Sequence, residues 1–246
     1  MNDDMQERTR ILLGEQGLAR LAQAHVLVAG VGGVGGAVAE ALARAGVGAI
    51  TLLDHDTVAL SNLNRQLVAL HSTLGRRKAE AMAERMRDIR PDIRVEARLE
   101  FVRPETADAL IAEGGFDFVL DCIDSIACKA ALIHACQRRE APVYSSLGAG
   151  GRLDVSKVGV SSLNQTHTCA LARELRRALR ERGAALNVPV VYSWETPIKA
   201  LPHQPVGGDV PGRSRAVNGT ISYMPNLFGM MLAGTALKGY LDSFAA

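Results

Sequence analysis

Short apolar runs alternate with helical patterns over residues 24–147, and this alternation constrains the fold more than any other feature of the chain. The predicted strands are Ala24–Ala29, Ala49–Asp54, Arg94–Leu99, Phe116–Asp121 and Val143–Leu147. The predicted helices between them are Val34–Ala45, Arg76–Arg90, Thr106–Glu113 and Ser125–Arg139. Strands that alternate with helices in this way pair in parallel, and helices cover both faces of the sheet. The sequence therefore predicts an α/β fold with a Rossmann-like, doubly wound, mostly parallel sheet.

The second half of the chain changes character after the glycine-rich stretch Gly148–Gly151. It predicts strands at Arg152–Val160 and Val188–Trp194, helices at Thr168–Arg182 and Asn226–Tyr240, and a loop at Leu201–Arg215. Because no repeat or linker divides the chain, we expect one domain, 1–246, whose C-terminal half extends the same sheet. Its expected parts are an N-terminal helical arm (1–23), a nucleotide-binding half (24–151) and a substrate-binding and dimer half (152–246).

Composition excludes several classes of protein. Hydrophobic residues make up 48% of the chain and the formal net charge is +2, values that do not suit a disordered chain. The near-neutral charge argues against a nucleic-acid coat protein but leaves room for a local basic patch. None of the four cysteines forms a Cys-x-x-Cys pair, so no zinc site is expected. The polar start of the chain, Met1–Arg10, and the short apolar stretches predict a cytoplasmic protein with no membrane span.

A glycine loop follows the first predicted strand and opens the first predicted helix. Gly30, Gly32 and Gly35 have the G-x-G-x-x-G spacing, and Gly33 lies in the same loop. Such a loop lets phosphates approach a helix N-terminus, where free N–H groups favour anions. Asp54 ends the next strand, where a carboxylate can accept hydrogen bonds from a ribose. We therefore predict a nucleotide site; the alternative is a glycine turn that binds nothing.

Polar residues of a kind that suits a triphosphate follow the second strand. Asn64, Arg65 and Gln66 are consecutive, and Lys78 starts the next charged helix. Asp124 follows the fourth strand, at the sheet edge where open α/β sheets bind ligands. NAD is the default ligand of this glycine spacing, but nucleotidyl transfer is the chemistry that needs this much charge around its phosphates. The alternative for Arg65 and Lys78 is an ordinary surface charge.

Over residues 8–150 the chain resembles the adenylating superfamily of ubiquitin-activating enzymes and the ThiF, MoeB and HesA proteins. The resemblance depends on Gly30–Gly35, Asp54, Ser61–Gln66, Lys78 and Asp121–Asp124. It implies an ATP site. The residues that it assigns to ATP binding are Gly30, Gly32, Gly33, Gly35, Asp54 for the ribose, Asn64, and Gln66 as a support of the loop.

The same resemblance implies the catalytic residues. Arg65 and Lys78 would grip the triphosphate together with Asn64, and Asp124 would hold Mg²⁺. Asp121, the first acid of its motif, is expected only to support the turn. Arg8 would reach into the site of a partner subunit in a homodimer, with Arg10 as the nearby alternative.

Within this superfamily, the chain is most similar to the tRNA threonylcarbamoyladenosine dehydratase branch. The shared segments are Leu13–Leu18, Arg44–Gly48, Asn64–Gln66, Lys78–Arg85, Ile123–Ser125, Lys129–Ile133, Gly148–Gly151 and Leu171–Arg176. The similarity implies an ATP-dependent dehydratase that adenylates the threonyl carboxylate of a modified adenosine beside the tRNA anticodon. The carbamoyl group then closes the ring, so no enzyme cysteine is required. The similarity leaves open whether the protein binds a monovalent cation and whether it works with a cysteine desulfurase or another sulfur-relay partner.

A basic helix is the predicted tRNA contact. Arg173, Arg176, Arg177 and Arg180 lie within a stretch of local charge +3, which could follow phosphates. The alternative is a solvated helix face. Arg213 and Arg215 provide a second candidate.

Two further functions stay open at this stage. One is an enzyme that activates the C-terminal glycine of a ubiquitin-like or sulfur-carrier protein, although such enzymes commonly carry the Cys-x-x-Cys pairs that this sequence lacks. The other is an NAD-binding module without turnover.

Overall fold

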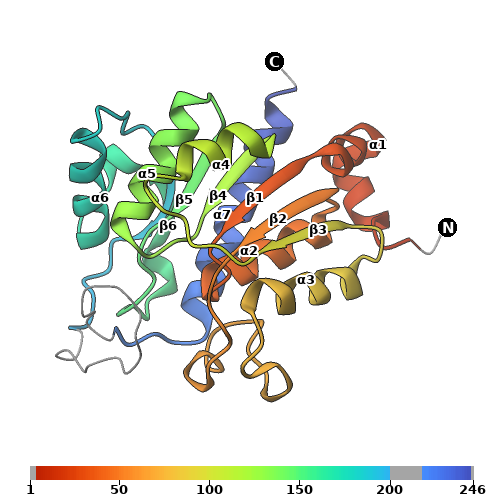
Figure 1. Ribbon diagram of the computed structural model, residues 1–246, viewed down its shortest axis with the longest axis horizontal. Helices are drawn as coiled ribbons and strands as arrows, with labels where there is room; N and C mark the ends of the chain where they lie inside the picture. Colours follow the sequence, from red (N-terminus) through yellow and green to blue (C-terminus); the bar gives the residue numbers. More distant parts are fainter. Residues whose placement is uncertain (1–3, 200–217, 245–246) are drawn as a thin grey trace.

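A seven-stranded, mostly parallel sheet runs through the part of the chain described by the computed structural model, residues 4–199 and 218–244 (Figure 1). Its order is β3-β2-β1-β4-β5-β7-β6. The strands are β1 His25–Ala29, β2 Ala49–Leu53, β3 Arg94–Arg98, β4 Phe118–Asp121, β5 Val143–Ser146, β6 Val158–Ser162 and β7 Pro189–Ser193. β6 pairs with β7 antiparallel, and the other described pairs are parallel. The predicted α/β class and the extension of one sheet by the C-terminal half are confirmed.

Helices cover both faces of the sheet. The α-helices are α1 Glu7–Gln23, α2 Gly33–Ala45, α3 Lys78–Ile89, α4 Ala107–Gly114, α5 Ile126–Arg138, α6 Ala170–Arg180 and α7 Tyr223–Asp242. Short 3₁₀ turns occur at Leu60–Asn62, His71–Thr73, Val155–Lys157 and Leu163–Gln165. In Figure 1, α4 and α5 lie in front of the sheet, and α2 and α7 lie behind it.

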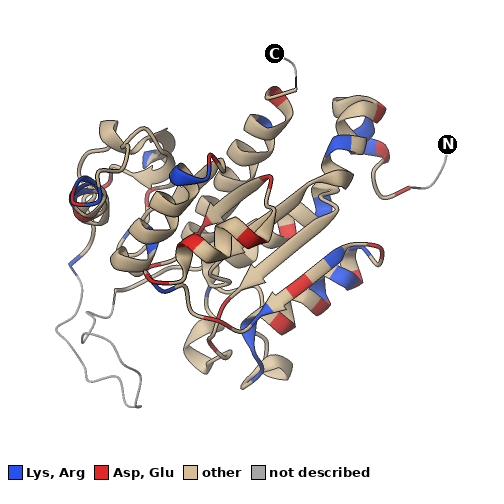
Figure 2. Cartoon of the chain, turned by 45° about the horizontal axis from the view of Figure 1, so that its top comes forward, with Lys and Arg blue, Asp and Glu red and all other residues tan. Residues whose placement is uncertain are grey.

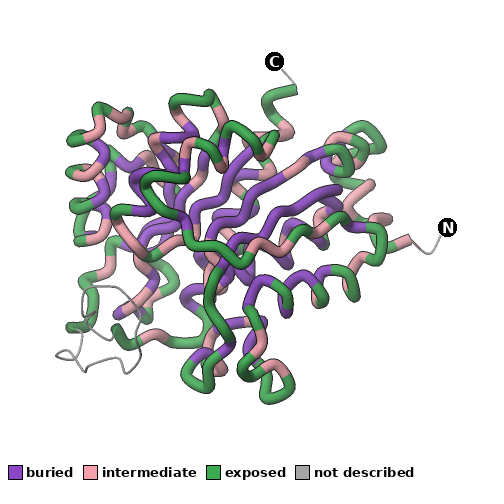
Figure 3. Tube along the Cα trace, in the orientation of Figure 1, coloured by how far each residue is buried: buried purple, intermediate pink, exposed green. Residues whose placement is uncertain are grey.

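The core consists of two apolar layers, one on each face of the sheet. Along β1, Val26 and Val28 face the layer formed with α2, α3 and α7, whereas Leu27 and Ala29 face the layer formed with α4, α5 and α6. Figure 3 shows the central strands as buried and the outer helix faces as exposed. Removing each large aliphatic side chain from water contributes roughly 1.5–3 kcal/mol, so the two layers hold the sheet edge that carries the site.

Two predicted elements differ from the observed ones by more than two residues at an end. The predicted strand Arg152–Val160 is wrong in its first half, because the Asp154 side chain accepts from the Ser156 N–H at 3.0 Å and starts a 3₁₀ turn before β6. The last helix begins at Tyr223 rather than Asn226, since Pro225 lies in its first turn, where N–H groups need no helical partner. The predicted loop Leu201–Arg215 lies outside the described residues.

None of the described helices combines the length and the apolar character that a membrane span requires.

Helix α7 packs directly on α2, the helix that follows the glycine loop. The closest approach is at Gly229, where an added Cβ would lie 2.5 Å from the Val34 carbonyl oxygen and 2.7 Å from the Ala37 Cβ. Only a residue without a side chain fits there. The position of α2, and with it that of the glycine loop, therefore depends on the C-terminal helix.

We predict that Gly229→Ala destabilises the protein by about 1–3 kcal/mol, because a methyl group cannot be accommodated between the two helices. Thermal unfolding would show a melting temperature lowered by several degrees. Gly234→Ala, on the same helix but with no atom within 4 Å of the added Cβ, is the matched control. The control should be neutral or stabilising by up to about 1 kcal/mol from helix propensity. Equal melting temperatures for both variants would contradict this account of the packing.

Candidate functional site

A cavity of about 410 Å³ opens at the carboxyl ends of the central strands. Its walls include the glycine loop, the residues after β2, those after β3, and Cys122–Asp124 after β4. β1 lies between β2 and β4 in the sheet. From β1 the chain adds β2 and β3 on one side, and then returns to add β4 and β5 on the other side. Such a switch point is where open α/β sheets bind ligands.

The glycine loop turns too tightly for side chains. Gly30 adopts φ +90° and donates its N–H to the Leu53 carbonyl at 2.8 Å. A Cβ on Gly35 would lie 1.7 Å from the Gly30 carbonyl oxygen, so Gly35 supports the loop from beneath the cavity wall. Gly32 lines the cavity, and a Cβ there would meet the protein only at Gln66 Nε2, 3.8 Å away. The protein therefore leaves room for a ligand above Gly32.

Asp54 is held in place by backbone amides. Its Oδ2 accepts from the Val31 N–H at 2.7 Å and its Oδ1 accepts from the Asp56 N–H at 2.8 Å. The side chain is largely buried but borders the cavity. Each carboxylate oxygen can accept more than one hydrogen bond. An oriented carboxylate beside the glycine loop suits the hydroxyl groups of a ribose.

Lys78, the first residue of α3, lies on the same wall and is 7% exposed. Its Nζ is 2.8 Å from Asp56 Oδ2, and the His55 Nε2 lies 3.3 Å from the other oxygen of Asp56. The Lys78 ammonium group has three N–H donors, and Asp56 accepts a hydrogen bond from one of them. The surface-charge alternative for Lys78 is therefore wrong, because the side chain is buried at the cavity.

Arg65 and Gln66 line the cavity, but Asn64 does not belong to its described wall. The Arg65 guanidinium donates to the Ser61 carbonyl at 2.9 Å and to Asn64 Oδ1 at 2.8 Å. Asn64 Nδ2 donates to the Thr220 carbonyl at 2.9 Å. Asn64 thus connects Arg65 to the chain before α7. The Gln66 Oε1 is buried without a hydrogen-bond partner among the described residues.

The residues after β4 form the opposite wall. Asp124 is exposed and lines the cavity, whereas Asp121 is fully buried and forms an ion pair with Lys129 at 2.6 Å. The predicted supporting place of Asp121 agrees with this geometry. Burial, reinforced by the charge of Asp121, raises the pKa of the Cys122 thiol. Cys122 is therefore a protonated thiol and a poor nucleophile near neutral pH.

Oxygen ligands for Mg²⁺ occur on both walls. Asp54, His55 and Asp56 are close enough for their ligand atoms to lie within 4.8 Å of one another, but Asp54 is occupied by amides and Asp56 by Lys78. Asp124 lines the cavity on the other side. Mg²⁺ in nucleotide sites is held by one or two carboxylates together with phosphate oxygens. The carboxylate of Asp124 at the cavity fits the donor type that Mg²⁺ needs, and its role as the metal ligand stays a prediction.

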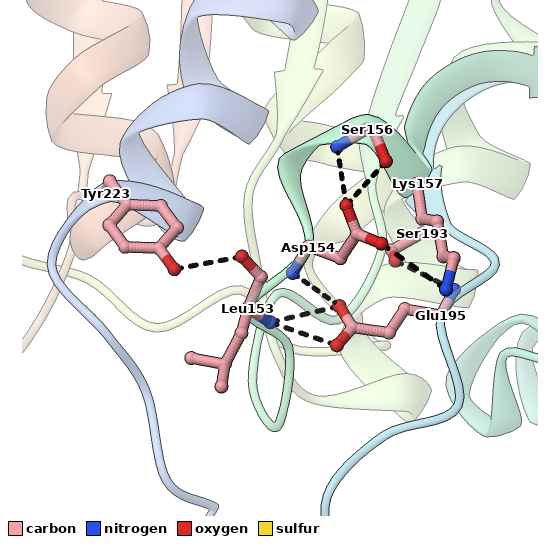
Figure 4. Close-up of polar contacts among 7 residues, drawn as sticks. All are labelled: Leu153, Asp154, Ser156, Lys157, Ser193, Glu195 and Tyr223. Carbon is pink, nitrogen blue, oxygen red and sulfur yellow. Dashed lines mark hydrogen bonds and ion pairs between the residues drawn. The ribbon is translucent and has the colours of Figure 1, made fainter.

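A second polar network lies in segments next to the cavity wall that contains Ala149, Gly150 and Thr220 (Figure 4). The Glu195 carboxylate accepts from the N–H groups of Leu153 at 3.0 Å and Asp154 at 2.9 Å, and Tyr223 donates its hydroxyl to the Leu153 carbonyl at 2.9 Å. Nearby, the Gly151 N–H donates to the Gly219 carbonyl at 2.8 Å. Ala149, Gly150 and Thr220 from these segments line the cavity. No spacing in the sequence indicates that Glu195 anchors this wall.

The N-terminal arginines lie away from the cavity wall of their own chain. Both are on α1; Arg8 is exposed, whereas Arg10 forms ion pairs with Asp4 at 2.5 Å and Glu15 at 2.8 Å. Ile11 and Leu12 beside them are 79% and 84% exposed. This placement is what a role in a partner subunit requires, and that role stays a prediction.

The basic helix α6 presents some of its arginines to solvent. Arg173, Arg177 and Arg180 are exposed, and Arg177 pairs with Glu181 at 2.9 Å. Arg176 instead donates to the carbonyls of Leu163 at 3.1 Å and Thr166 at 3.0 Å. In Figure 2, the positive charges of α6 lie at the left edge of the molecule, whereas both signs of charge alternate on α3 and β3. Arg176 therefore fixes the helix to the preceding turn, whereas the other three are exposed, with Arg177 in its ion pair with Glu181.

The fold and the cavity define a nucleotide-binding α/β protein whose phosphate side is lined by cations. The chain belongs to the ThiF family, whose model matches residues 6–243. It is 36% identical over 238 residues to the tRNA threonylcarbamoyladenosine dehydratase of Bacillus subtilis (strain 168), covering 95% of this chain and 93% of that protein.

Solved structures agree with this relationship. The Escherichia coli tRNA N6-threonylcarbamoyladenosine dehydratase TcdA in complex with ATP matches with a TM-score of 0.85 and 38% identity, covering 97% of this chain and 94% of that one. The molybdopterin-synthase adenylyltransferase of Escherichia coli (strain K12) is 39% identical, but over 56% of this chain and 54% of that protein.

We predict that Gly32→Ala leaves the fold intact and weakens ATP binding at least tenfold, because the new methyl group occupies space that the loop leaves for phosphates. Calorimetric titration with ATP would measure the change. Gly36→Ala is the matched control, since its Cβ would make an ordinary 3.9 Å contact with Leu67 away from the cavity. If ATP binds Gly32→Ala and Gly36→Ala equally well, the phosphates do not lie on this loop.

Proposed function

We propose that this protein is an ATP-dependent tRNA threonylcarbamoyladenosine dehydratase. The observation that carries the proposal is the similarity over 93% of the length of the Bacillus subtilis enzyme, combined with the cavity that gathers Asp54, Arg65, Lys78 and Asp124 at the switch point. The ATP and AMP complexes of the similar Escherichia coli protein support ATP as the nucleotide. The substrate is the modified adenosine beside the anticodon of tRNA, and the products are its cyclic form, AMP and pyrophosphate.

In the first step, the threonyl carboxylate attacks the α-phosphorus of ATP and pyrophosphate leaves. Asp54 holds the ribose, and the amides of the glycine loop hold phosphate oxygens. Arg65 and Lys78 neutralise the negative charge that builds up on the departing pyrophosphate, which is the largest electrostatic demand of the reaction. Asp124 would hold Mg²⁺, which when bound would supply a further positive charge that stabilises the phosphates.

In the second step, the carbamoyl group of the same nucleoside attacks the acyl-adenylate, the ring closes and AMP leaves. Both reacting groups belong to one molecule, so the step is effectively unimolecular. No thiol of the enzyme is needed. The cysteines agree with a reaction that uses no thiol. Cys122, which lines the cavity, has a raised pKa, and Cys169, just before α6, is buried.

The proposal includes a homodimer in which Arg8 of each copy enters the site of the other. It also includes a cytoplasmic location, and it leaves room for a monovalent cation and for a sulfur-relay partner such as a cysteine desulfurase. Activation of a ubiquitin-like carrier protein is the second candidate. The molybdopterin-synthase relative matches a much smaller share of the chain, which favours the tRNA substrate.

The test is pyrophosphate release from ATP by the purified protein. We expect tRNA that carries threonylcarbamoyladenosine to stimulate release, and mass analysis of its nucleosides to show the loss of one water. Unmodified tRNA is the control and should give no stimulation. Stimulation only by a carrier protein with a Gly-Gly tail would favour the second candidate, and NAD binding without pyrophosphate release would contradict both.

Helix α6 is the tRNA contact in this proposal. Its exposed arginines, Arg173, Arg177 and Arg180, form the basic face, and Arg176 holds that face in position. Each arginine that binds a phosphate releases counterions, so binding through this face weakens as salt rises.

We predict that replacing Arg173, Arg177 and Arg180 by Ala weakens tRNA binding and lowers the slope of log affinity against log salt by about one for each arginine–phosphate pair removed. Filter binding at several salt concentrations would measure both. The control removes equal charge at Arg44 on α2, Arg87 on α3 and Arg94 on β3, all exposed and outside α6. An unchanged slope in the α6 variant would identify this face as solvated surface.

A further inference from the structure

The most deeply buried charges of the described chain lie next to Cys122–Asp124, the segment after β4 that lines the cavity. Lys129 on α5 and Asp121 at the end of β4 are both 0% exposed, and their ion-pair distance is 2.6 Å. Lys129 belongs to the Ala-rich helix Ile126–Arg138, where its position in the sequence does not distinguish it from a solvated residue.

Every donor of Lys129 has an acceptor. Its Nζ donates to Asp121 Oδ2 at 2.6 Å, to Ser145 Oγ at 3.1 Å and to the Ser146 carbonyl at 2.9 Å. Ser145 in turn donates to Asp121 Oδ2 at 2.7 Å. A fully satisfied buried network has one geometry, because each displaced group would leave an unpaired charge or dipole in a low dielectric.

This network joins two walls of the cavity. Asp121 Oδ1 accepts from the Ile123 N–H at 3.2 Å, which fixes the turn that carries Asp124. Ser145 and Ser146 end β5, and the chain continues from them to Ala149 and Gly150 on the second wall. Lys129 therefore determines where the metal-type carboxylate stands relative to the wall of the C-terminal half.

Stability alone does not account for such a pair. Removing two charges from water costs several kcal/mol per ion, and apolar side chains of similar volume are often equally or more stabilising. An apolar pair would leave the Ile123 N–H and the Ser146 carbonyl without these partners. What the charged pair contributes is a fixed position for the residues around it.

We propose that Lys129 and Asp121 are positioning residues that set Asp124 for binding Mg²⁺ with ATP. The inference rests on the proposed function through the metal role of Asp124. Removing a residue that orients a metal ligand typically lowers metal affinity or activity by about 10- to 100-fold.

The test compares ATP affinity with and without Mg²⁺, measured by calorimetry on the full-length protein. The main variant is Asp121→Val combined with Lys129→Met, which replaces the charges by apolar groups. Ser145→Ala is the second variant; it leaves the ion pair and removes one tether. Cys136→Ala, equally buried on α5 but outside the network, is the control for loss of stability.

For the wild type, we expect Mg²⁺ to increase ATP affinity. In the double variant, this increase should fall at least tenfold, as in Asp124→Ala, while affinity for ATP without Mg²⁺ stays within about threefold. Ser145→Ala should lose part of the increase, and Cys136→Ala none of it. The rate of pyrophosphate release should follow the same order.

The inference would be overturned if the double variant folds and Mg²⁺ increases its ATP affinity as much as in the wild type. If the double variant does not fold, an unchanged Mg²⁺-dependent increase in Ser145→Ala would overturn it. A wild type whose ATP affinity is independent of Mg²⁺ would overturn it as well. A protein that shows the expected Mg²⁺ effects but releases no pyrophosphate with modified tRNA would contradict the proposed function and leave the inference standing.

Discussion

The turn from β1 into α2 is the constraint on which the rest of the structure depends. Gly35 approaches the Gly30 carbonyl so closely that no side chain fits, and this brings the start of α2 to the carboxyl edge of the sheet. Asp54 then binds the Val31 amide, which ties the end of β2 to the same turn. Helix α7 holds α2 from behind at Gly229. The phosphate side of the site is thus formed by backbone, and side chains are added around it.

Much of the fold and half of the site follow from local patterns. Short apolar runs and helical patterns predict the strands and helices up to β5, because strands of a parallel sheet covered on both faces are apolar throughout. The glycine spacing and Asp54 are also local. By contrast, Asn64 binds the Thr220 carbonyl and Glu195 binds the amides after Arg152, across large separations in sequence. No periodicity encodes such contacts. In the sequence, Lys129 and Arg176 are indistinguishable from surface charges, and only the acceptors around them reveal their roles.

The site has two halves with different origins. The segments up to Asp124 supply the nucleotide end, and the opposite wall combines Ala149 and Gly150, which follow β5, with Thr220 from the chain before α7. Two polar bridges join them: Asn64 links Arg65 to the chain before α7, and Lys129 links the Asp124 turn to β5. Both bridges connect the wall on the far side of the cavity to segments that carry the proposed ATP and metal ligands. This coupling suits an enzyme that must have ATP and a bulky acceptor in place together.

The state of the thiols has a consequence for how the protein tolerates oxidation. All four cysteines are free, and three of them are buried. Burial raises the pKa of Cys136 to about 12, and the Cys122 thiol is shifted in the same direction. Peroxide reacts with thiolates, so neither residue is an easy target. Since the proposed chemistry stores nothing on sulfur, oxidation of a thiol would not in itself remove a reacting group.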